Sequence, residues 1–156
     1  MRHALSTGPR PLPPAALWLG FAGLAPQLML AVVAIAGPAR FASAARDAGV
    51  AYSGIILSFI GGAWWGLASR AHANVHWSNW IAAVTPSLIA FAAIGAMAIG
   101  QPRGQSLWLT GTSLIATLGI DRRLAANGLT PPGWLGLRVS LSLGLGGLTI
   151  LMAILS

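Results

Sequence analysis

The sequence has no cysteine, lysine or glutamate, and its only acidic residues are Asp47 and Asp121. Without cysteine it can form no disulfide, thiol nucleophile or cysteine-ligated zinc site. Two carboxylates leave most acid–base chemistry without a general base, and no HExxH, nucleophile-elbow, Walker or DxD pattern occurs. We therefore expect a protein that is not an enzyme and that holds no metal or cofactor.

Charge is also scarce. Charged residues make up 7% of the chain and hydrophobic residues 56%, whereas about a quarter of a typical soluble domain is charged. All nine basic residues are arginine, and the net charge is +7. Nucleic-acid-binding proteins gather basic residues on a solvated face; these arginines instead lie between apolar runs, as in membrane proteins. The composition thus predicts a lipid bilayer as the surroundings and no nucleic-acid partner.

Five apolar runs come close to the ~20 residues that a membrane-spanning helix needs. They cover about residues 16–36, 50–69, 79–99, 105–120 and 134–155. Because these runs are continuously apolar, they indicate helices and not the alternating strands of a membrane barrel. The predicted fold class is all-α, an integral membrane bundle of five transmembrane helices.

The same pattern predicts the domain organisation. A proline-rich lead-in, residues 1–15, precedes a single membrane domain, residues 16–156. The first run is longer than the core of a signal peptide, so we expect it to be retained as a helix. Residues 37–49 are expected to form a short linker outside the membrane.

The arginines predict the orientation, because cytoplasmic loops of membrane proteins carry the excess of basic residues. With the N-terminus inside, six arginines lie on the inner side and three on the outer side. The inner ones are Arg2, Arg10, Arg70, Arg122, Arg123 and Arg138, and the outer ones Arg40, Arg46 and Arg103. We expect a bacterial inner-membrane protein with a cytoplasmic N-terminus and a periplasmic C-terminus.

One end of the predicted bundle gathers six of the seven tryptophans, which are Trp18, Trp64, Trp65, Trp77, Trp80 and Trp134. An anchoring belt combined with a topology signal accounts for such an end. The alternative is a face for anionic lipid headgroups or another ligand. Its candidate residues are Trp65, Arg70, His72, His76, Trp77, Arg122 and Trp134. His72 and His76 have the spacing of metal ligands on a helix, but no further ligand is evident nearby.

Small residues recur every fourth position in two of the runs. They are Gly54, Ser58, Gly62 and Gly66 in the second run, and Gly136, Ser140 and Gly144 in the fifth. Such stripes let helix backbones approach closely within a membrane. The partner could be another helix of the chain or a second protomer.

Two further features concern the membrane interior. Pro26 and Pro86 lie within predicted spans, where each lacks the amide hydrogen that a helix requires, and we expect kinks that could leave a cavity. Arg138 lies one turn inside the fifth run, where an unpaired charge is expensive. We predict an ion pair with Asp121, within ~4 Å; Arg122 and lipid phosphates are competing partners.

Several motifs point to a known family. They are AYSG at 51–54, ILSFIGG at 56–62, WG at 65–66 and DRRL at 121–124, followed by Gly128, Leu129, Pro132 and Arg138, with GLAP at 23–26 and GP at 37–38 in the first helix region. Through these motifs nearly the whole chain resembles the transmembrane protein 69 family. The resemblance implies a multi-span architecture and supplies no activity. The resemblance also implies a histidine directly before Trp65, but this sequence has Trp64 at that position.

The leading functional prediction is a non-enzymatic accessory or scaffold subunit that packs against another membrane protein or a second copy. The alternative is a small carrier or a protein that binds lipids or small molecules in a cavity near the kinks. A cavity that reaches Gln27 or Thr85 would favour the second prediction, and a dry bundle with an exposed small-residue face the first.

Overall fold

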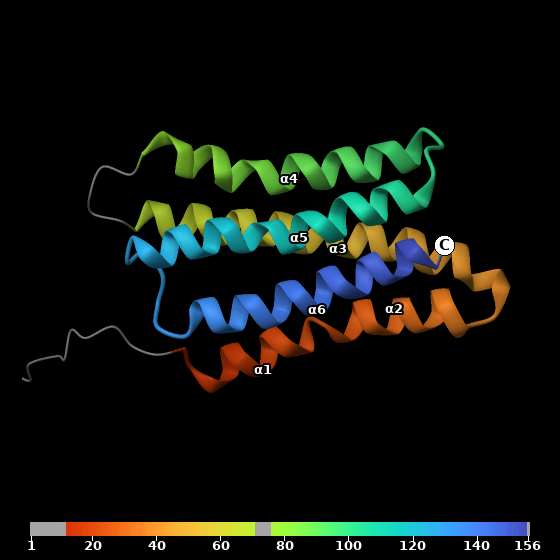
Figure 1. Ribbon diagram of the computed structural model, residues 1–156, viewed down its shortest axis with the longest axis horizontal. Helices are drawn as coiled ribbons and strands as arrows, with labels where there is room; N and C mark the ends of the chain where they lie inside the picture. Colours follow the sequence, from red (N-terminus) through yellow and green to blue (C-terminus); the bar gives the residue numbers. More distant parts are fainter. Residues whose placement is uncertain (1–11, 71–75, 156) are drawn as a thin grey trace, which may run out of the picture.

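The computed structural model describes residues 12–70 and 76–155, which form six α-helices and no strand. Figure 1 shows the helices running side by side along the long axis of the molecule. They are α1 (Pro14–Ala22), α2 (Ala25–Ala36), α3 (Ala39–Ser69), α4 (Trp77–Ala98), α5 (Arg103–Ala126) and α6 (Trp134–Ile154). The predicted all-α class is confirmed.

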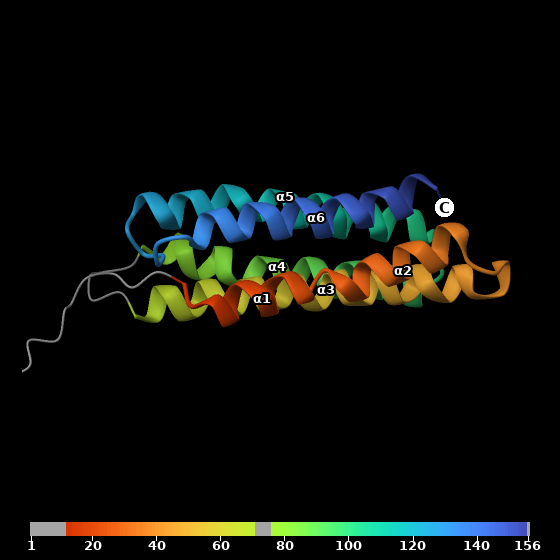
Figure 2. The ribbon, with the colours of Figure 1, turned by 90° about the horizontal axis from the view of Figure 1, so that it is seen from below.

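The helices pack in two layers, which Figure 2 shows from the side. One layer holds α4, α3 and the α1–α2 pair, and the other holds α5 and α6. Helices α3 and α5 end, and α4 and α6 begin, at one end of the bundle, which we call the Asp121 end. The opposite end, where α3 and α5 begin, is called the Asp47 end.

Pro26 interrupts the first predicted span. It has no amide hydrogen to donate to the carbonyl of Ala22, and α1 ends at Ala22 while α2 begins at Ala25. Tyr52 Oη on α3 donates a 2.6 Å hydrogen bond to the carbonyl oxygen of Gly23, within this break. The predicted kink is thus confirmed at Pro26, whereas α4 continues through Pro86 as one helix.

The predicted linker over residues 37–49 is wrong, because α3 begins at Ala39. Its first turns are held by contacts at the Asp47 end. Arg46 Nη2 donates to the carbonyl oxygens of Ala34 (3.3 Å) and Leu155 (3.1 Å), at the C-terminal ends of α2 and α6. Asp47 pairs with Arg103 at the start of α5. These tertiary contacts stabilise helix where the sequence shows no long apolar run.

Four helical segments are long and apolar enough to cross a membrane, which agrees with a membrane protein. They are Pro14–Ala36, Ala39–Ser69, Trp77–Ala98 and Trp134–Ile154. The fourth predicted span, 105–120, lies within α5, which is not among them. Four polar residues of α5 turn inward: Ser106, Thr110, Thr117 and Asp121 are all buried.

Candidate functional site

The carboxylate of Asp121 lies at the centre of a buried polar cluster at the Asp121 end. Its side chain is completely buried, and it accepts hydrogen bonds from three neighbours. Oδ1 accepts from the indole nitrogens of Trp64 (2.8 Å) and Trp134 (3.2 Å), and Oδ2 accepts from Arg138 Nε (2.8 Å). The structure therefore contains the Asp121–Arg138 ion pair that the sequence analysis predicts, with two indole donors added to it.

Three helices position these side chains. Asp121 lies in the last turns of α5, and Trp64 lies near the end of α3. Trp134 and Arg138, four residues apart, share one face at the start of α6. Gly133 precedes α6 with φ of 85°, a backbone conformation that side chains with a Cβ rarely adopt. This turn brings α6 back against α5 directly after the connection, so Arg138 meets Asp121.

Arg138 is 7% exposed, and its guanidinium group is shared between two partners. Besides Nε on Asp121, Nη2 donates to Thr117 Oγ1 (3.1 Å), and Thr117 lies 3.5 Å from Ser142 Oγ. Nη1 has no hydrogen bond to any residue in the described part of the chain. A lone charge in such a place would be strongly destabilised, but the pair with Asp121 makes the cluster neutral overall.

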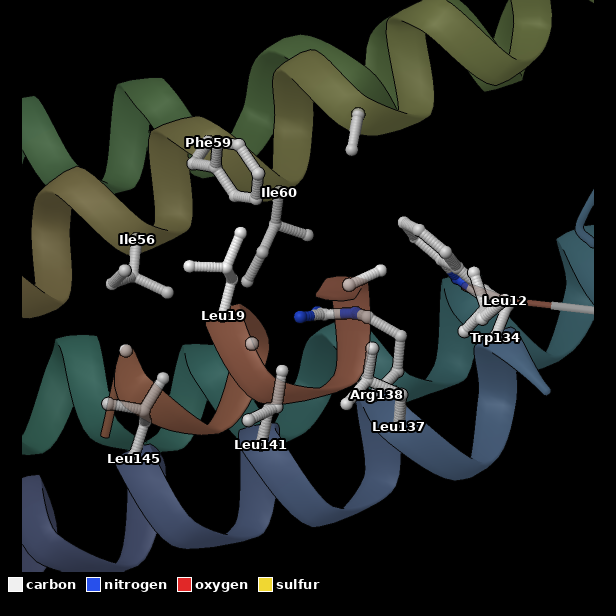
Figure 3. A pocket seen from close by; sticks show the side chains of 14 residues that line it. Leu12, Leu19, Ile56, Phe59, Ile60, Trp134, Leu137, Arg138, Leu141 and Leu145 are labelled. Atoms are coloured by element: carbon white, nitrogen blue, oxygen red, sulfur yellow. The ribbon is translucent and has the colours of Figure 1, made fainter. Parts of the chain in front are cut away.

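A cleft lies beside this cluster, between α1, α3 and α6; we call it the α1 cleft. Its volume is about 360 Å³, within the range of roughly 300–1,000 Å³ that is typical of small-molecule sites. Figure 3 shows Trp134 and Leu12 at one end, Ile56 and Leu145 at the other, and Arg138 pointing into the space between. Among the described lining residues Arg138 is the only charged one, and the rest are almost all apolar.

A second cavity of about 250 Å³ lies between α4 and α5. Its lining includes Trp64, Thr85 and Thr117. Trp64 and Thr117 also belong to the Asp121 cluster, and Trp134 and Arg138 line the α1 cleft, so the cluster borders both cavities. A cavity therefore reaches Thr85, whereas Gln27 is fully buried and donates to Thr149 Oγ1 (2.8 Å) in the core.

The predicted headgroup face divides into two groups. Trp134 belongs to the cluster, while Arg70, Arg122, His76 and Trp77 are exposed. Trp65 is half exposed and packs edge-on against Trp80, with ring centroids 4.7 Å apart.

His76 caps the start of α4: its Nδ1 accepts from the backbone amide of Ser78 (3.3 Å). His72 lies outside the described residues, as do residues 1–11 of the predicted lead-in. In the described part of the chain no three His, Cys, Asp or Glu side chains gather in a way that could hold a metal ion.

The predicted small-residue stripes pack only in part. Gly54 lies against Ala90 of α4 and Gly144 against Leu24, and Ser58 is half buried. Gly62, Gly66, Gly136 and Ser140 are exposed. At 3.6 residues per turn every fourth residue advances by about 40° around a helix, so a stripe from Gly54 to Gly66 turns away from its first partner.

Other glycines make the closest helix contacts. A Cβ at Gly61 would collide with the carbonyl oxygen of Ala83 on α4. Gly111 of α5 and Gly146 of α6 face one another in the same manner: a Cβ on either would lie within 3.1 Å of the other's carbonyl oxygen. The spacing of small residues in the sequence does not reveal these positions. Because Gly61 and Gly62 are adjacent, either of them could have made the close contact with α4.

Trp64 and Thr117 are the members of the cluster that the sequence analysis missed. A buried indole N–H requires an acceptor, and Asp121 is the one side-chain carboxylate predicted at this end, so it is the signal that could have identified Trp64. The sequence pattern places Trp64 among the interfacial tryptophans instead.

Comparison with known proteins places the chain in a family. No curated protein and no solved structure matches it, and the resemblance to the transmembrane protein 69 family stays a prediction. A family model described as "Protein of unknown function (DUF3429)" matches residues 12–154. Because that match covers almost the whole chain, including the Asp121 cluster and the α1 cleft, the chain belongs to the DUF3429 family.

Proposed function

We propose that this chain is a multi-pass membrane protein that binds an amphipathic small molecule in the α1 cleft. One observation supports this most directly: the guanidinium group of Arg138 reaches into a cleft whose walls are otherwise almost entirely apolar. A cavity with mainly apolar walls and a single well-placed polar group is the usual form of a small-molecule site. This corresponds to the second functional prediction from the sequence.

The proposal includes α5 as a fifth crossing. Its 24 residues rise about 36 Å, which exceeds the ~30 Å hydrocarbon core of a bilayer. Helices α3, α4 and α6 all pack against it. Its buried hydroxyl groups donate within the bundle, as Ser106 Oγ does to the carbonyl oxygen of Ala93 (2.9 Å). Polar side chains that make their hydrogen bonds inside the bundle do not prevent a helix from crossing the membrane.

The proposal also places the Asp121 end on the cytoplasmic side of a bacterial inner membrane. Arg70, Arg122 and Arg123 are exposed at this end, as the distribution of basic residues in inner-membrane proteins favours. Since the chain has no cysteine, single cysteines at the exposed positions Asn127 and Gln101 would report the orientation. A membrane-impermeant maleimide should label Gln101→Cys in spheroplasts and Asn127→Cys only after lysis.

The partners of the two acidic residues support a protein that binds its ligand without catalysing a reaction. Asp121 is fully engaged in its cluster, and Asp47 is paired with Arg103. Neither side-chain carboxylate is therefore free to act as a general base.

The experiment that tests binding uses cleft-filling variants. Gly20 lines the cleft, and a Cβ there would lie 3.4 Å from Leu137 and Leu141. Gly20→Phe should occupy the cleft, whereas Gly147→Phe on the exposed face of α6 should not. Native mass spectrometry of protein purified in mild detergent should show a bound molecule in wild type and Gly147→Phe that Gly20→Phe loses. An equal content of bound molecules in all three proteins would contradict the proposal.

A second candidate is the accessory or scaffold role. Exposed Gly62 and Gly66 on α3, and Gly136 and Ser140 on α6, favour it, because small residues let a partner helix approach. A bulky residue there, such as Gly66→Ile, should reduce co-purification of a membrane partner in stoichiometric amounts. Unchanged co-purification would exclude this face as the contact.

A further inference from the structure

We propose that the polar end of the bound molecule is an uncharged carbonyl-type acceptor, such as an ester, ketone or quinone oxygen, held by Arg138 Nη1. This inference rests on the proposed function, because it specifies the chemistry of the occupant of the α1 cleft. It follows from the donors that the cleft offers, from the charge of the cluster, and from the shape of the walls.

The first step concerns donors. Arg138 Nε is engaged by Asp121 and Nη2 by Thr117, while Nη1 bonds to no residue in the described part of the chain. The indole nitrogen of Trp134, the other polar group of the lining side chains, already donates to Asp121. The cleft thus presents one free donor group and no free side-chain acceptor. A ligand group that only accepts a hydrogen bond fits this single donor. A hydroxyl or amine would also bring an O–H or N–H that finds no acceptor in the cleft.

The second step concerns charge. Asp121 is fully buried and already balances the charge of Arg138, at 2.8 Å. A carboxylate or phosphate would give the buried cluster a net negative charge, which is costly where water is excluded. The other arginines of this end, Arg70 and Arg122, are exposed and do not line the cleft. A neutral carbonyl oxygen receives the hydrogen bond without this cost.

The third step concerns the walls. Along α6 the lining runs from Trp134 to Leu145, a rise of about 16 Å, or one half of the hydrocarbon core. Ile56, Ile60, Leu137 and Leu141 supply an apolar surface for an alkyl or isoprenoid chain. Leu19 of α1 lines the cleft and is 74% exposed, so the cleft opens sideways toward the lipid. An occupant can therefore enter from the membrane.

Three probes of equal chain length separate the possibilities: methyl palmitate, hexadecyl phosphate and hexadecane. Binding is measured by native mass spectrometry on the full chain in nanodiscs of zwitterionic lipid. We expect methyl palmitate to bind about tenfold more tightly than hexadecane, which corresponds to one net hydrogen bond, and hexadecyl phosphate to bind more weakly than the ester. Infrared spectra of methyl palmitate labelled with carbon-13 at its carbonyl should show the band shifted to lower frequency in the wild-type protein.

Variants assign that shift to the cleft. Gly20→Phe, which leaves the ion pair untouched, should abolish the shifted band, and Gly147→Phe should retain it. The neutral Asp121→Asn/Arg138→Met protein has no hydrogen-bond donor at position 138, so it should bind methyl palmitate and hexadecane equally. Tighter binding of hexadecyl phosphate, or bound ester without a shifted band, would overturn the carbonyl assignment while leaving binding in the cleft intact. If none of the three probes binds, the proposed function itself fails.

Discussion

Tyr52 Oη on α3 lies 2.6 Å from the carbonyl oxygen of Gly23, the residue that follows the end of α1, and donates a hydrogen bond to it. The regular hydrogen bonds resume with Leu28 N donating to the carbonyl oxygen of Leu24 (3.0 Å). Helix α1 buries no residue, so this bond is one of few contacts that fix its direction over the cleft.

We expect Tyr52→Phe to loosen α1 without disrupting the rest of the bundle. The loss of one hydrogen bond should reduce the free energy of unfolding by about 1 kcal/mol. Hydrogen–deuterium exchange should become faster in Pro14–Ala22 and stay unchanged in α6. Thr85→Val is the control, because that hydroxyl bonds only to its own helix, at Ile81. Faster exchange throughout the protein would show instead that Tyr52 supports the whole fold.

The Asp121–Arg138 pair should behave as a unit. Removal of either partner leaves a buried charge uncompensated, so Asp121→Asn and Arg138→Gln should each cost about 3–5 kcal/mol of unfolding free energy. The double substitution should cost clearly less than the sum of the two single ones. Reversible unfolding in detergent, followed through a double-mutant cycle, measures this coupling.

The exposed pair of Asp47 and Arg103 provides the control cycle. Their side chains are 42% and 50% exposed, so water and salt screen the interaction. We expect almost no coupling energy there. Equal coupling in the two cycles would mean that burial is not what distinguishes the pair at the Asp121 end.

Two adjacent tryptophans should differ in their effect. Trp64 is 3% exposed and donates to Asp121, whereas Trp65 is 49% exposed and packs on Trp80. Trp64→Phe should cost about 1.5–3 kcal/mol, the range for hydrogen bonds to charged groups, and Trp65→Phe should cost less than 1 kcal/mol or so. Thermal unfolding of the two variants measures both losses of stability. A larger loss for Trp65→Phe than for Trp64→Phe would contradict the hydrogen bond from Trp64 to Asp121.

The sequence predicted those features that depend on neighbouring positions along the chain. Arg138 needed a counter-charge, Asp121 lay across a short connection, and Pro26 lacked the amide hydrogen that a helix requires. Features that depend on tertiary placement were not accessible in this way. Helix at 39–49 is stabilised by Arg46 and Asp47 contacting distant helix ends, and the α1 cleft is lined by α1, α3 and α6, which lie far apart in the sequence.

The small-residue stripe shows why spacing alone was insufficient. Gly61 and Gly62 are adjacent, so they point about 100° apart on the helix, and the sequence offered no means of choosing between them. The choice depends on where α4 passes, and α4 passes beside Gly61. The same reasoning explains why Trp64 turned inward and Trp65 outward.

That pair of glycines supplies a direct test of the packing. Gly61→Ala places a methyl group against the carbonyl oxygen of Ala83, so α3 and α4 must separate, and we expect a loss of about 1–3 kcal/mol in unfolding free energy. Gly62→Ala meets no atom within 4 Å and should be neutral or slightly stabilising, since alanine favours helix. Both variants make the same chemical change one residue apart. If Gly62→Ala proved the more damaging in a detergent unfolding titration, the Gly62 stripe would be the true contact and the register of α3 against α4 described above would be wrong.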